Sequence, residues 1–205
     1  MSASIPTVII GASGYVGGEL LRLIAGHPNF ELKAAVSDSA AGKAIGEVFG
    51  HLATAFDAQT FVAHDDWLNH VEANSDLALF SAAPHGASAA VIANAIEACE
   101  KQGISLHVVD SSADFRFARQ EQWETVYRAE HGAPQLLDNF VCAVPEHLDK
   151  CDVAHVGHPG CFATASTLAT VPLIQSGLTE AEVFISGVTV STGSGKTPHA
   201  GTHHP

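Results

Sequence analysis

The sequence has few basic residues, and this scarcity limits what the protein can bind. Lysine and arginine together number 9 against 22 aspartates and glutamates, so the formal net charge is −13. A surface of that sign repels phosphate backbones, which argues against nucleic acid as a partner. It does not exclude a small anionic substrate, because local hydrogen-bond donors decide such binding.

Long apolar runs and paired cysteines are also missing. The first residues carry no basic segment, and the apolar run Val8-Ile9-Ile10 ends at Gly11, which argues against a signal peptide or a membrane span there. None of the four cysteines forms a C-x-x-C pair. Reduced thiols in a cytoplasmic protein are the simplest interpretation. With 205 residues, 46% of them hydrophobic, the chain has ample material for one large domain or for one domain and part of a second.

Short apolar segments alternate with segments of helical periodicity. Strands are predicted at residues 7–10, 32–36, 77–81 and 106–110, and helices at 19–24 and 87–102. This alternation predicts an α/β fold, a Rossmann-like doubly wound parallel sheet with helices on both faces.

The composition changes near Val153. A strand is predicted at 153–156, a helix at 162–174 and an alternating strand at 182–192, which would open a second sheet. We therefore predict a dinucleotide-binding domain at 1–154 and, at 155–205, the incomplete first part of an α+β substrate or dimerisation domain.

The segment between the first strand and the first helix is rich in glycine. It reads GASGYVG from Gly11 to Gly17, with Gly14 between them. Glycines in this context allow a tight turn, close approach of the backbone to a pyrophosphate and close helix–strand packing. Free N–H groups at the helix start would bind the phosphates. The segment predicts a dinucleotide site.

The end of the second predicted strand gives conflicting signals about the dinucleotide. Asp38 there is the type of residue that holds the ribose hydroxyls of NAD, whereas Ser37 and the nearby Lys43 favour the 2′-phosphate of NADP. Asp38 as a cap of the following turn is an equally good interpretation.

Cys161 follows Pro159-Gly160 and begins a predicted helix, where the helix dipole favours a thiolate. A thiolate attacks acyl carbonyls to form thioesters. The alternative is a small buried apolar residue. Its position distinguishes Cys161 from the other three cysteines, which are Cys99, Cys142 and Cys151.

Two polar segments end the predicted strands on the ligand-binding edge. Pro84-His85-Gly86 follows one strand, and DSSADFR, from Asp110 to Arg116, follows the next. Arg116 has the geometry to clamp a carboxylate or a phosphate. In the alternative interpretation Asp114 pairs with Arg116 or caps a helix.

Ser194-Gly195-Lys196-Thr197 resembles the end of a P-loop, but Val190 stands where that motif requires glycine. We therefore exclude a P-loop. His199, His203 and His204 lie in a Gly/Pro-rich loop, which favours a solvated or substrate-facing segment, so no metal site is predicted.

Four segments in this order, GASGYVGGELLRLI, SAAPHG, DSSADFR and HPGCFATA, resemble the N-acetyl-γ-glutamyl-phosphate reductases. N-acetyl-aminoadipyl-phosphate reductases and aspartate-semialdehyde dehydrogenases are relatives. The resemblance runs from about Thr7 to Gly195 and implies NADPH-dependent reduction of an acyl phosphate to a semialdehyde in arginine biosynthesis. The small acyl phosphate would be its binding partner. A homo-oligomer and a cytoplasmic location are also implied.

The resemblance assigns roles to individual residues. Cys161 would be the nucleophile, and Ser37 would face the ribose phosphate, which favours NADP(H) as the cofactor. The pyrophosphate loop would comprise Gly11, Ser13, Gly14, Tyr15, Val16 and Gly17, and the nicotinamide side would comprise Pro84, His85 and Gly86. Ser112, Arg116, Ser191, Gly193 and Lys196 would contact substrate.

The sequence departs from the family in three places. His158 replaces the family's asparagine before Pro-Gly-Cys, and Phe162 replaces tyrosine. The run TGSGK, at 192–196, replaces Ser-Gly-Ala-Gly-Arg, which leaves the acyl chain length open between the N-acetylglutamyl, aminoadipyl and aspartyl substrates. No histidine of the chain matches the family's catalytic base. We therefore expect the chain alone to bind dinucleotide without turnover, or to be a non-catalytic NADP-binding fragment.

Overall fold

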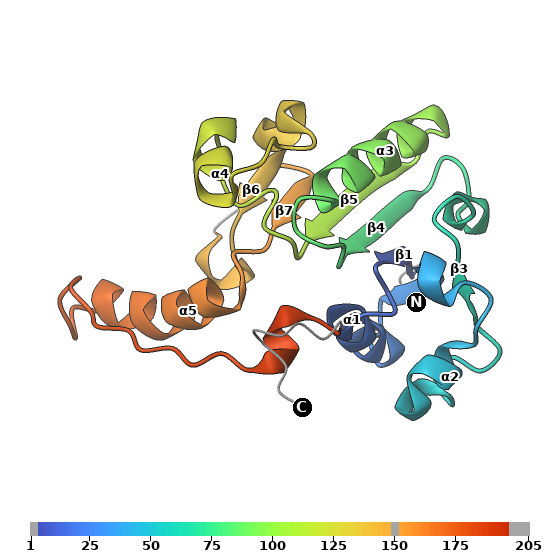
Figure 1. The fold of residues 1–205 in the computed structure, drawn as a ribbon, viewed down its shortest axis with the longest axis horizontal. Helices are drawn as coiled ribbons and strands as arrows, with labels where there is room; N and C mark the ends of the chain where they lie inside the picture. The colour runs from blue at the N-terminus through green and yellow to red at the C-terminus, as the bar shows by residue number, and fades with distance from the viewer. Residues whose placement is uncertain (1–3, 149–151, 197–205) are drawn as a thin grey trace.

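The computed structural model describes residues 4–148 and 152–196, and its main feature is one parallel sheet (Figure 1). Within these residues the strand order is β3-β2-β1-β4-β5-β7-β6, and every named pair of neighbours is parallel. The strands are β1 (Ile5–Ile10), β2 (Phe30–Val36), β3 (Phe61–Val62), β4 (Asp76–Ser81), β5 (Ser105–Asp110), β6 (Phe140–Cys142) and β7 (His155–Gly157). The order reverses between β1 and β4, which is where ligands bind in open sheets of this class.

Helices α1 to α4 lie between successive strands, and α5 follows β7. The α-helices are α1 (Tyr15–Ala25), α2 (Ile45–Val48), α3 (Ser88–Lys101), α4 (Gln120–Tyr127) and α5 (Cys161–Gln175). The short 3₁₀ turns are η1 (Asp38–Ala40), η2 (Gly50–Leu52), η3 (Trp67–His70), η4 (Pro134–Asn139), η5 (Pro145–His147) and η6 (Ser191–Ser194). Among the helices of the described residues, none is long and apolar enough to cross a membrane.

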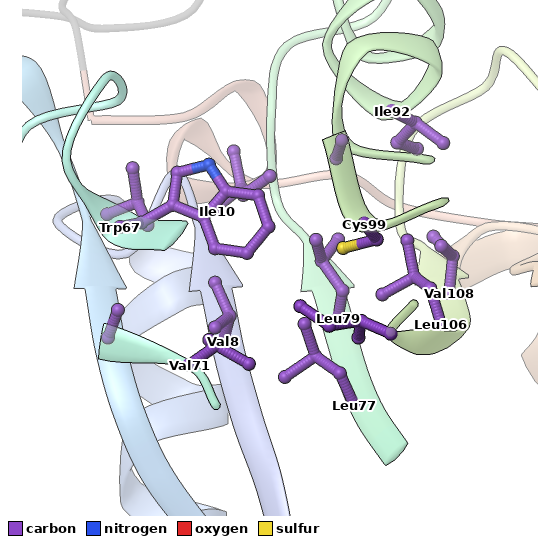
Figure 2. Close-up of a cluster of buried hydrophobic side chains, with 14 of the residues drawn as sticks. Val8, Ile10, Trp67, Val71, Leu77, Leu79, Ile92, Cys99, Leu106 and Val108 are labelled. Atoms are coloured by element: carbon purple, nitrogen blue, oxygen red, sulfur yellow. The ribbon is translucent and has the colours of Figure 1, made fainter. Parts of the chain in front are cut away.

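Alternating side chains of the central strands build a core on each face of the sheet. Val8 and Ile10 of β1 pack with α3 and with Trp67 of η3, in the cluster that Figure 2 shows. Ile9, between them, points to the opposite face and packs with Leu21 of α1. A strand buried on both faces reads as a continuous apolar run, which explains Val8-Ile9-Ile10. The doubly wound fold predicted from the sequence is confirmed.

The region after β7 differs from the prediction. Helix α5 extends away from the sheet in Figure 1, and none of its residues is buried. The alternating segment 182–192 was predicted to be a strand, and this is wrong: residues 183–190 form no strand, and Phe184 and Val188 are exposed. A strand needs a hydrogen-bonded neighbour, and within the described residues this segment has none. The strand predicted at 153–156 is β7, and it pairs with β5 and β6 of the first sheet, so that sheet extends to Gly157. The domain boundary at 154/155 stays a prediction.

A buried histidine, His155, joins β7 to β5. Its Nδ1 accepts a hydrogen bond from the backbone N–H of Val108 at 3.2 Å, and its ring lies 4.9 Å from the Phe140 ring. Burial lowers the pKa of His155 from its ordinary value, with a further contribution from His107, although a backbone hydrogen bond to Ala154 opposes the shift. The fold therefore favours the neutral ring.

The first prediction follows from His155. Because its folded-state pKa is depressed, its stabilising contribution is present above the unfolded value of 6.5 and is lost as pH falls below it. His155→Asn keeps an acceptor near the Nδ1 position but does not titrate. We expect the urea midpoint of the wild type to fall more than that of His155→Asn between about pH 7.5 and about pH 5.5. His51→Asn, at an exposed site, is the control, and equal slopes in all three proteins would contradict the assignment.

Helix α3 is capped by a carboxylate from a distant part of the chain. Buried Asp114, in the segment after β5, accepts hydrogen bonds from the backbone N–H of Gly86 at 2.7 Å and of Ala89 at 2.9 Å. A carboxylate at this position satisfies amides that the helix leaves free and interacts favourably with its dipole. Asp114 therefore fixes the loop that precedes α3.

The second prediction concerns this cap. Asp114→Asn preserves volume but replaces one accepting oxygen with an N–H₂ group that faces a donor. We expect a loss of about 1–3 kcal/mol in the free energy of unfolding, the usual cost of a broken charged hydrogen bond, measured by urea denaturation. Asp57→Asn, at an exposed position, provides the matched control. A loss at position 114 no larger than at position 57 would show that the cap contributes nothing.

Candidate active site

The ends of four strands form the candidate site. Ile10 pairs with Ser81, Ser81 with Asp110 and Asp110 with Gly157, so β1, β4, β5 and β7 end in one row. The glycine loop, the 84–86 loop, the DSSADFR segment and the Cys161 turn all begin at this row. The parallel register thus brings together segments that are far apart in the sequence.

The glycine loop places a different demand on each of its three glycines. Gly11 has φ +73°, and a Cβ there would lie 2.6 Å from the carbonyl oxygen of Ala82. A Cβ on Gly17 would lie 2.5 Å from the Cα of Ala12. A Cβ on Gly14 would meet only the Gly11 oxygen, at 3.5 Å, and would otherwise point into open space. Gly11 and Gly17 are therefore required by packing, and Gly14 leaves room for a ligand.

The start of α1 suits a phosphate group. Gly14 is the N-cap and has no side chain, so it supplies no capping acceptor to the first N–H groups of the helix. The side chains of Tyr15 and Val16 are exposed beside them. These features fit the pyrophosphate of a dinucleotide.

Hydroxyl groups link the glycine loop to the end of β2. Ser13 Oγ lies 2.7 Å from Ser37 Oγ, and Ser37 Oγ lies 3.3 Å from Ser39 Oγ. The side chain of Asp38 makes no hydrogen bond to its own turn within the described residues, and its Oδ1 accepts the backbone N–H of His64 at 2.7 Å. Lys43 is exposed. The serines, rather than Asp38, lie next to the glycine loop.

The 84–86 loop is fixed to the DSSADFR segment. His85 Nδ1 accepts the backbone N–H of Ala113 at 2.9 Å, and Gly86 donates to Asp114 as described above. Pro84, His85 and Gly86 are themselves exposed. Since Nδ1 is an acceptor, the neutral ring carries its proton on Nε2.

Below this loop lies a buried polar network centred on Asp110. Its carboxylate accepts hydrogen bonds from Ser88 Oγ at 2.7 Å, from Ser112 Oγ at 2.6 Å and from Ser112 N at 3.0 Å. Ser81 Oγ extends the network, 2.7 Å from Ser88 Oγ. The pKa of Asp110 is raised from its ordinary value, because the effect of burial outweighs the opposing effect of these hydrogen bonds. Ser112, predicted to contact substrate, is buried and donates to Asp110. No motif in the sequence pointed to Ser81 or Ser88.

Arg116 contacts the Cys161 turn. Its Nε donates to the carbonyl oxygen of His158 at 3.0 Å, and its Nη2 donates to the carbonyl oxygen of Ser111 at 3.4 Å. A Cβ on Gly160, whose φ is +101°, would lie 3.0 Å from the guanidinium. Of the two alternative roles predicted for Asp114, the structure shows the helix cap. The alternative ion pair between Asp114 and Arg116 is wrong.

Cys161 is the first residue of α5 and is exposed. Cys99 is buried within α3, where desolvation raises its pKa to about 11. Local desolvation also raises the pKa of the exposed Cys142, although the charge of Arg116 opposes this. Position and exposure thus distinguish Cys161 from Cys99, and Cys151 lies outside the described residues.

The last predicted substrate contacts make no hydrogen bond to this network within the described residues. Ser191 and Gly193 are in η6, and Lys196 follows it; all three are exposed. Within the described residues, no hydrogen bond joins residues 191–196 to Cys161, Ser112 or Arg116. In the part of the chain that the structure describes, no group of three or more His, Cys, Asp or Glu side chains is arranged to hold a metal. His199, His203 and His204 lie outside that part.

A solved structure shares this fold. The crystal structure of aspartate semialdehyde dehydrogenase with NADP from Candida albicans superposes with a TM-score of 0.55 over 85% of this chain and 48% of that one, at 18% sequence identity. At that identity the likeness supports the Rossmann-like fold and nothing finer.

Curated relatives are closer in sequence. N-acetyl-gamma-glutamyl-phosphate reductase of Methanopyrus kandleri is 37% identical, over 96% of this chain and 55% of its own length. The [LysW]-L-2-aminoadipate/[LysW]-L-glutamate phosphate reductase of Saccharolobus solfataricus is 35% identical, over 100% of this chain and 56% of its own. The N-acetyl-gamma-glutamyl-phosphate reductase of Corynebacterium glutamicum is 34% identical, over 94% of this chain and 53% of its own length. The chain thus spans about half the length of these relatives.

Family descriptions cover nearly the whole chain. Residues 161–205 match the semialdehyde dehydrogenase dimerisation domain, and residues 6–165 match the NAD-binding domain of the same family. The two matches overlap at the start of α5, where Cys161 lies. The glycine loop, the row of strand ends and these matches agree that the chain belongs to the semialdehyde dehydrogenase family.

Proposed function

We propose that this chain is the NADP-binding and nucleophile-bearing part of an acyl-phosphate reductase that converts N-acetyl-γ-glutamyl phosphate to N-acetylglutamate semialdehyde, a reaction of arginine biosynthesis. The observation that carries the proposal is the exposed Cys161 at the start of α5, on the same row of strand ends as the glycine loop. The names of the Methanopyrus and Corynebacterium relatives support this substrate. The 2-aminoadipate-type acyl phosphate, named for the Saccharolobus relative, is the second candidate.

In the proposed reaction Cys161 is the covalent nucleophile. Its thiolate attacks the acyl carbon, a C–S bond forms, the carbon–oxygen bond to phosphate breaks, and phosphate leaves with the bonding electrons. The first N–H groups of α5 would stabilise the negative oxygen of the tetrahedral intermediate. Bound NADPH supplies the hydride that takes the thioester to the aldehyde. Breaking the C–S bond returns the thiolate to Cys161, which is then ready for another substrate.

Five further residues would position the reactants. His85 presents Nε2–H from the loop after β4, on the side proposed for the nicotinamide, because Ala113 occupies its other nitrogen. Arg116 holds the Cys161 turn through the His158 carbonyl, and it would also contact substrate. Ser191, Gly193 and Lys196 would complete the substrate pocket. The match to a dimerisation domain supports a homo-oligomer.

The third prediction is a preference for NADPH over NADH. Ser13 and Ser37 place hydroxyls beside the glycine loop, whereas one carboxylate oxygen of Asp38 is held by His64 N–H. Hydroxyl donors favour a 2′-phosphate, and a free carboxylate would favour the ribose hydroxyls. We expect NADPH to bind at least about tenfold more tightly in calorimetric titrations of the chain.

Two variants separate the roles at this position. Ser37→Ala should reduce the preference for NADPH, and Asp38→Asn should leave NADH binding unchanged. Equal affinity for the two dinucleotides, or a loss of NADH binding in Asp38→Asn, would show that Asp38 governs the ribose pocket instead.

The fourth prediction tests the nucleophile without requiring turnover. Incubating the chain with freshly prepared N-acetyl-γ-glutamyl phosphate should release one phosphate per chain and add one acyl group to Cys161, observed by mass spectrometry of the intact chain and its peptides. Thioester formation needs only the thiolate and the acyl phosphate. Cys161→Ser should abolish both signals and leave NADPH affinity unchanged.

Cys142→Ser is the matched control, because Cys142 is also exposed. It should acylate like the wild type. Acylation of Cys142 instead of Cys161, or no phosphate release from a chain that binds NADPH, would favour a non-catalytic NADP-binding protein.

A further inference from the structure

We infer that His158 is a positioning residue for Cys161: its neutral ring closes the turn before α5 and ties that turn to the first turn of the helix. The inference deepens the proposed function, on which it rests for the role of Cys161 as nucleophile. It assigns a task to the residue that replaces asparagine in the HPGC segment.

Every polar group of His158 is engaged. Its backbone N–H donates to the carbonyl oxygen of Asp110 at 2.8 Å, and its own carbonyl accepts Arg116 Nε at 3.0 Å. Its ring Nδ1 accepts the backbone N–H of Gly160 at 3.1 Å. Its Nε2 lies 3.3 Å from Thr164 Oγ1. The backbone contacts fix the residue to the strand row, and the ring contacts lie on either side of Cys161.

The hydrogen bonds define the state of the ring. Because Nδ1 accepts the Gly160 N–H, it cannot carry a proton, so the neutral ring has its proton on Nε2. Nε2–H then donates to the Thr164 hydroxyl. Thr164 also donates its backbone N–H to the carbonyl oxygen of Gly160 at 2.9 Å, in the first turn of α5. One imidazole thus bridges the residue before Cys161 and the residue three after it.

This geometry explains how histidine can stand in place of asparagine. An asparagine side-chain oxygen accepts the N–H two residues ahead in an Asx turn, and His158 Nδ1 makes the same i to i+2 contact with Gly160. Asparagine has no second ring nitrogen to reach Thr164. The acceptor function is therefore common to both residue types, and the link to Thr164 is added by the ring.

The surroundings of His158 keep it neutral. Burial, and then the positive charge of Arg116, lower its pKa. The titratable or charged groups around the turn are Arg116 after β5, Asp110, which contributes its backbone carbonyl, Cys142 at the end of β6, and Cys161 itself. Protonation of Nδ1 would remove the acceptor for Gly160 and open the turn.

The fifth prediction is tested by the alkylation of Cys161. The variants are His158→Leu, which has no acceptor, His158→Asn, which restores one, and Thr164→Val, which removes only the Nε2 partner. We expect the iodoacetamide rate at Cys161, followed peptide by peptide, to fall about tenfold in His158→Leu. In His158→Asn the rate should stay within about threefold of the wild type. The rate in Thr164→Val should lie between those of His158→Asn and His158→Leu.

Two controls accompany these variants. His27 makes the same ring contact, with Nδ1 accepting the N–H of Asn29 at 3.2 Å, but at an exposed turn before β2, so His27→Leu should leave Cys161 unchanged. Cys99, which is buried within α3, reports in each chain whether the whole fold has loosened. The wild-type rate divided by the His158→Asn rate should also fall as pH drops through the folded-state pKa of His158, which lies below 6.5, because asparagine at this position does not titrate.

Wild-type alkylation in His158→Leu, or equally slow alkylation in His158→Asn and His158→Leu, would overturn the inference. If His158→Leu does not fold, the alkylation rates of wild type, Thr164→Val and His158→Asn and the pH dependence of the wild-type to His158→Asn ratio still test the inference. A ratio that does not change with pH, together with a wild-type rate in Thr164→Val, would contradict it. The readout uses no acyl phosphate. A chain that passes this test and fails to acylate therefore loses the proposed function and keeps the positioning role.

Discussion

Two buried aspartates, Asp110 and Asp114, hold the ends of the central strands in one arrangement. Asp110 accepts hydrogen bonds from Ser88 of α3 and from Ser112, and Asp114 accepts the amides of Gly86 and Ala89. A buried carboxylate is costly unless donors surround it, so the loops that supply these donors must keep their positions. The loop after β4 and the segment after β5 are therefore one unit, and Arg116 extends that unit to the Cys161 turn.

The fold was predictable where the sequence pattern reflects burial within one sheet. The run Val8-Ile9-Ile10 is apolar on both faces, and the structure buries both. Apolar and polar residues alternate in the segment 182–192 as they do in a half-buried strand. Residues 183–190 nevertheless form no strand pairing within the described chain. Alternation reports which side chains would face a sheet, and it cannot report whether a neighbouring strand is present. The match of this region to a dimerisation domain is consistent with a surface that needs further protein to cover it.

The candidate site was predictable where one residue type has one use. Gly11 and Gly17 follow from backbone geometry alone, and the structure shows the close contacts that exclude a Cβ. Polar residues with several uses were harder to assign. Ser112, predicted to contact substrate, donates to Asp110 within the fold, and Asp114 had two alternative roles, of which the structure shows the helix cap. Sequence spacing could not identify the partners of Asp114, because the fold brings them together from 25 and 28 positions away.

Arg116 shows how one side chain can serve both structure and chemistry. Its Nε and Nη2 are directed at backbone carbonyls, which leaves the guanidinium beside Gly160, one residue from Cys161. A guanidinium has five N–H donors, and two carbonyl contacts do not exhaust them. In the proposed reaction, the position that fixes the turn would also be the position from which a free donor reaches an anion held at Cys161. Lysine could not replace it, because a single ammonium cannot hold two carbonyls in a fixed plane and also present a further donor in that plane.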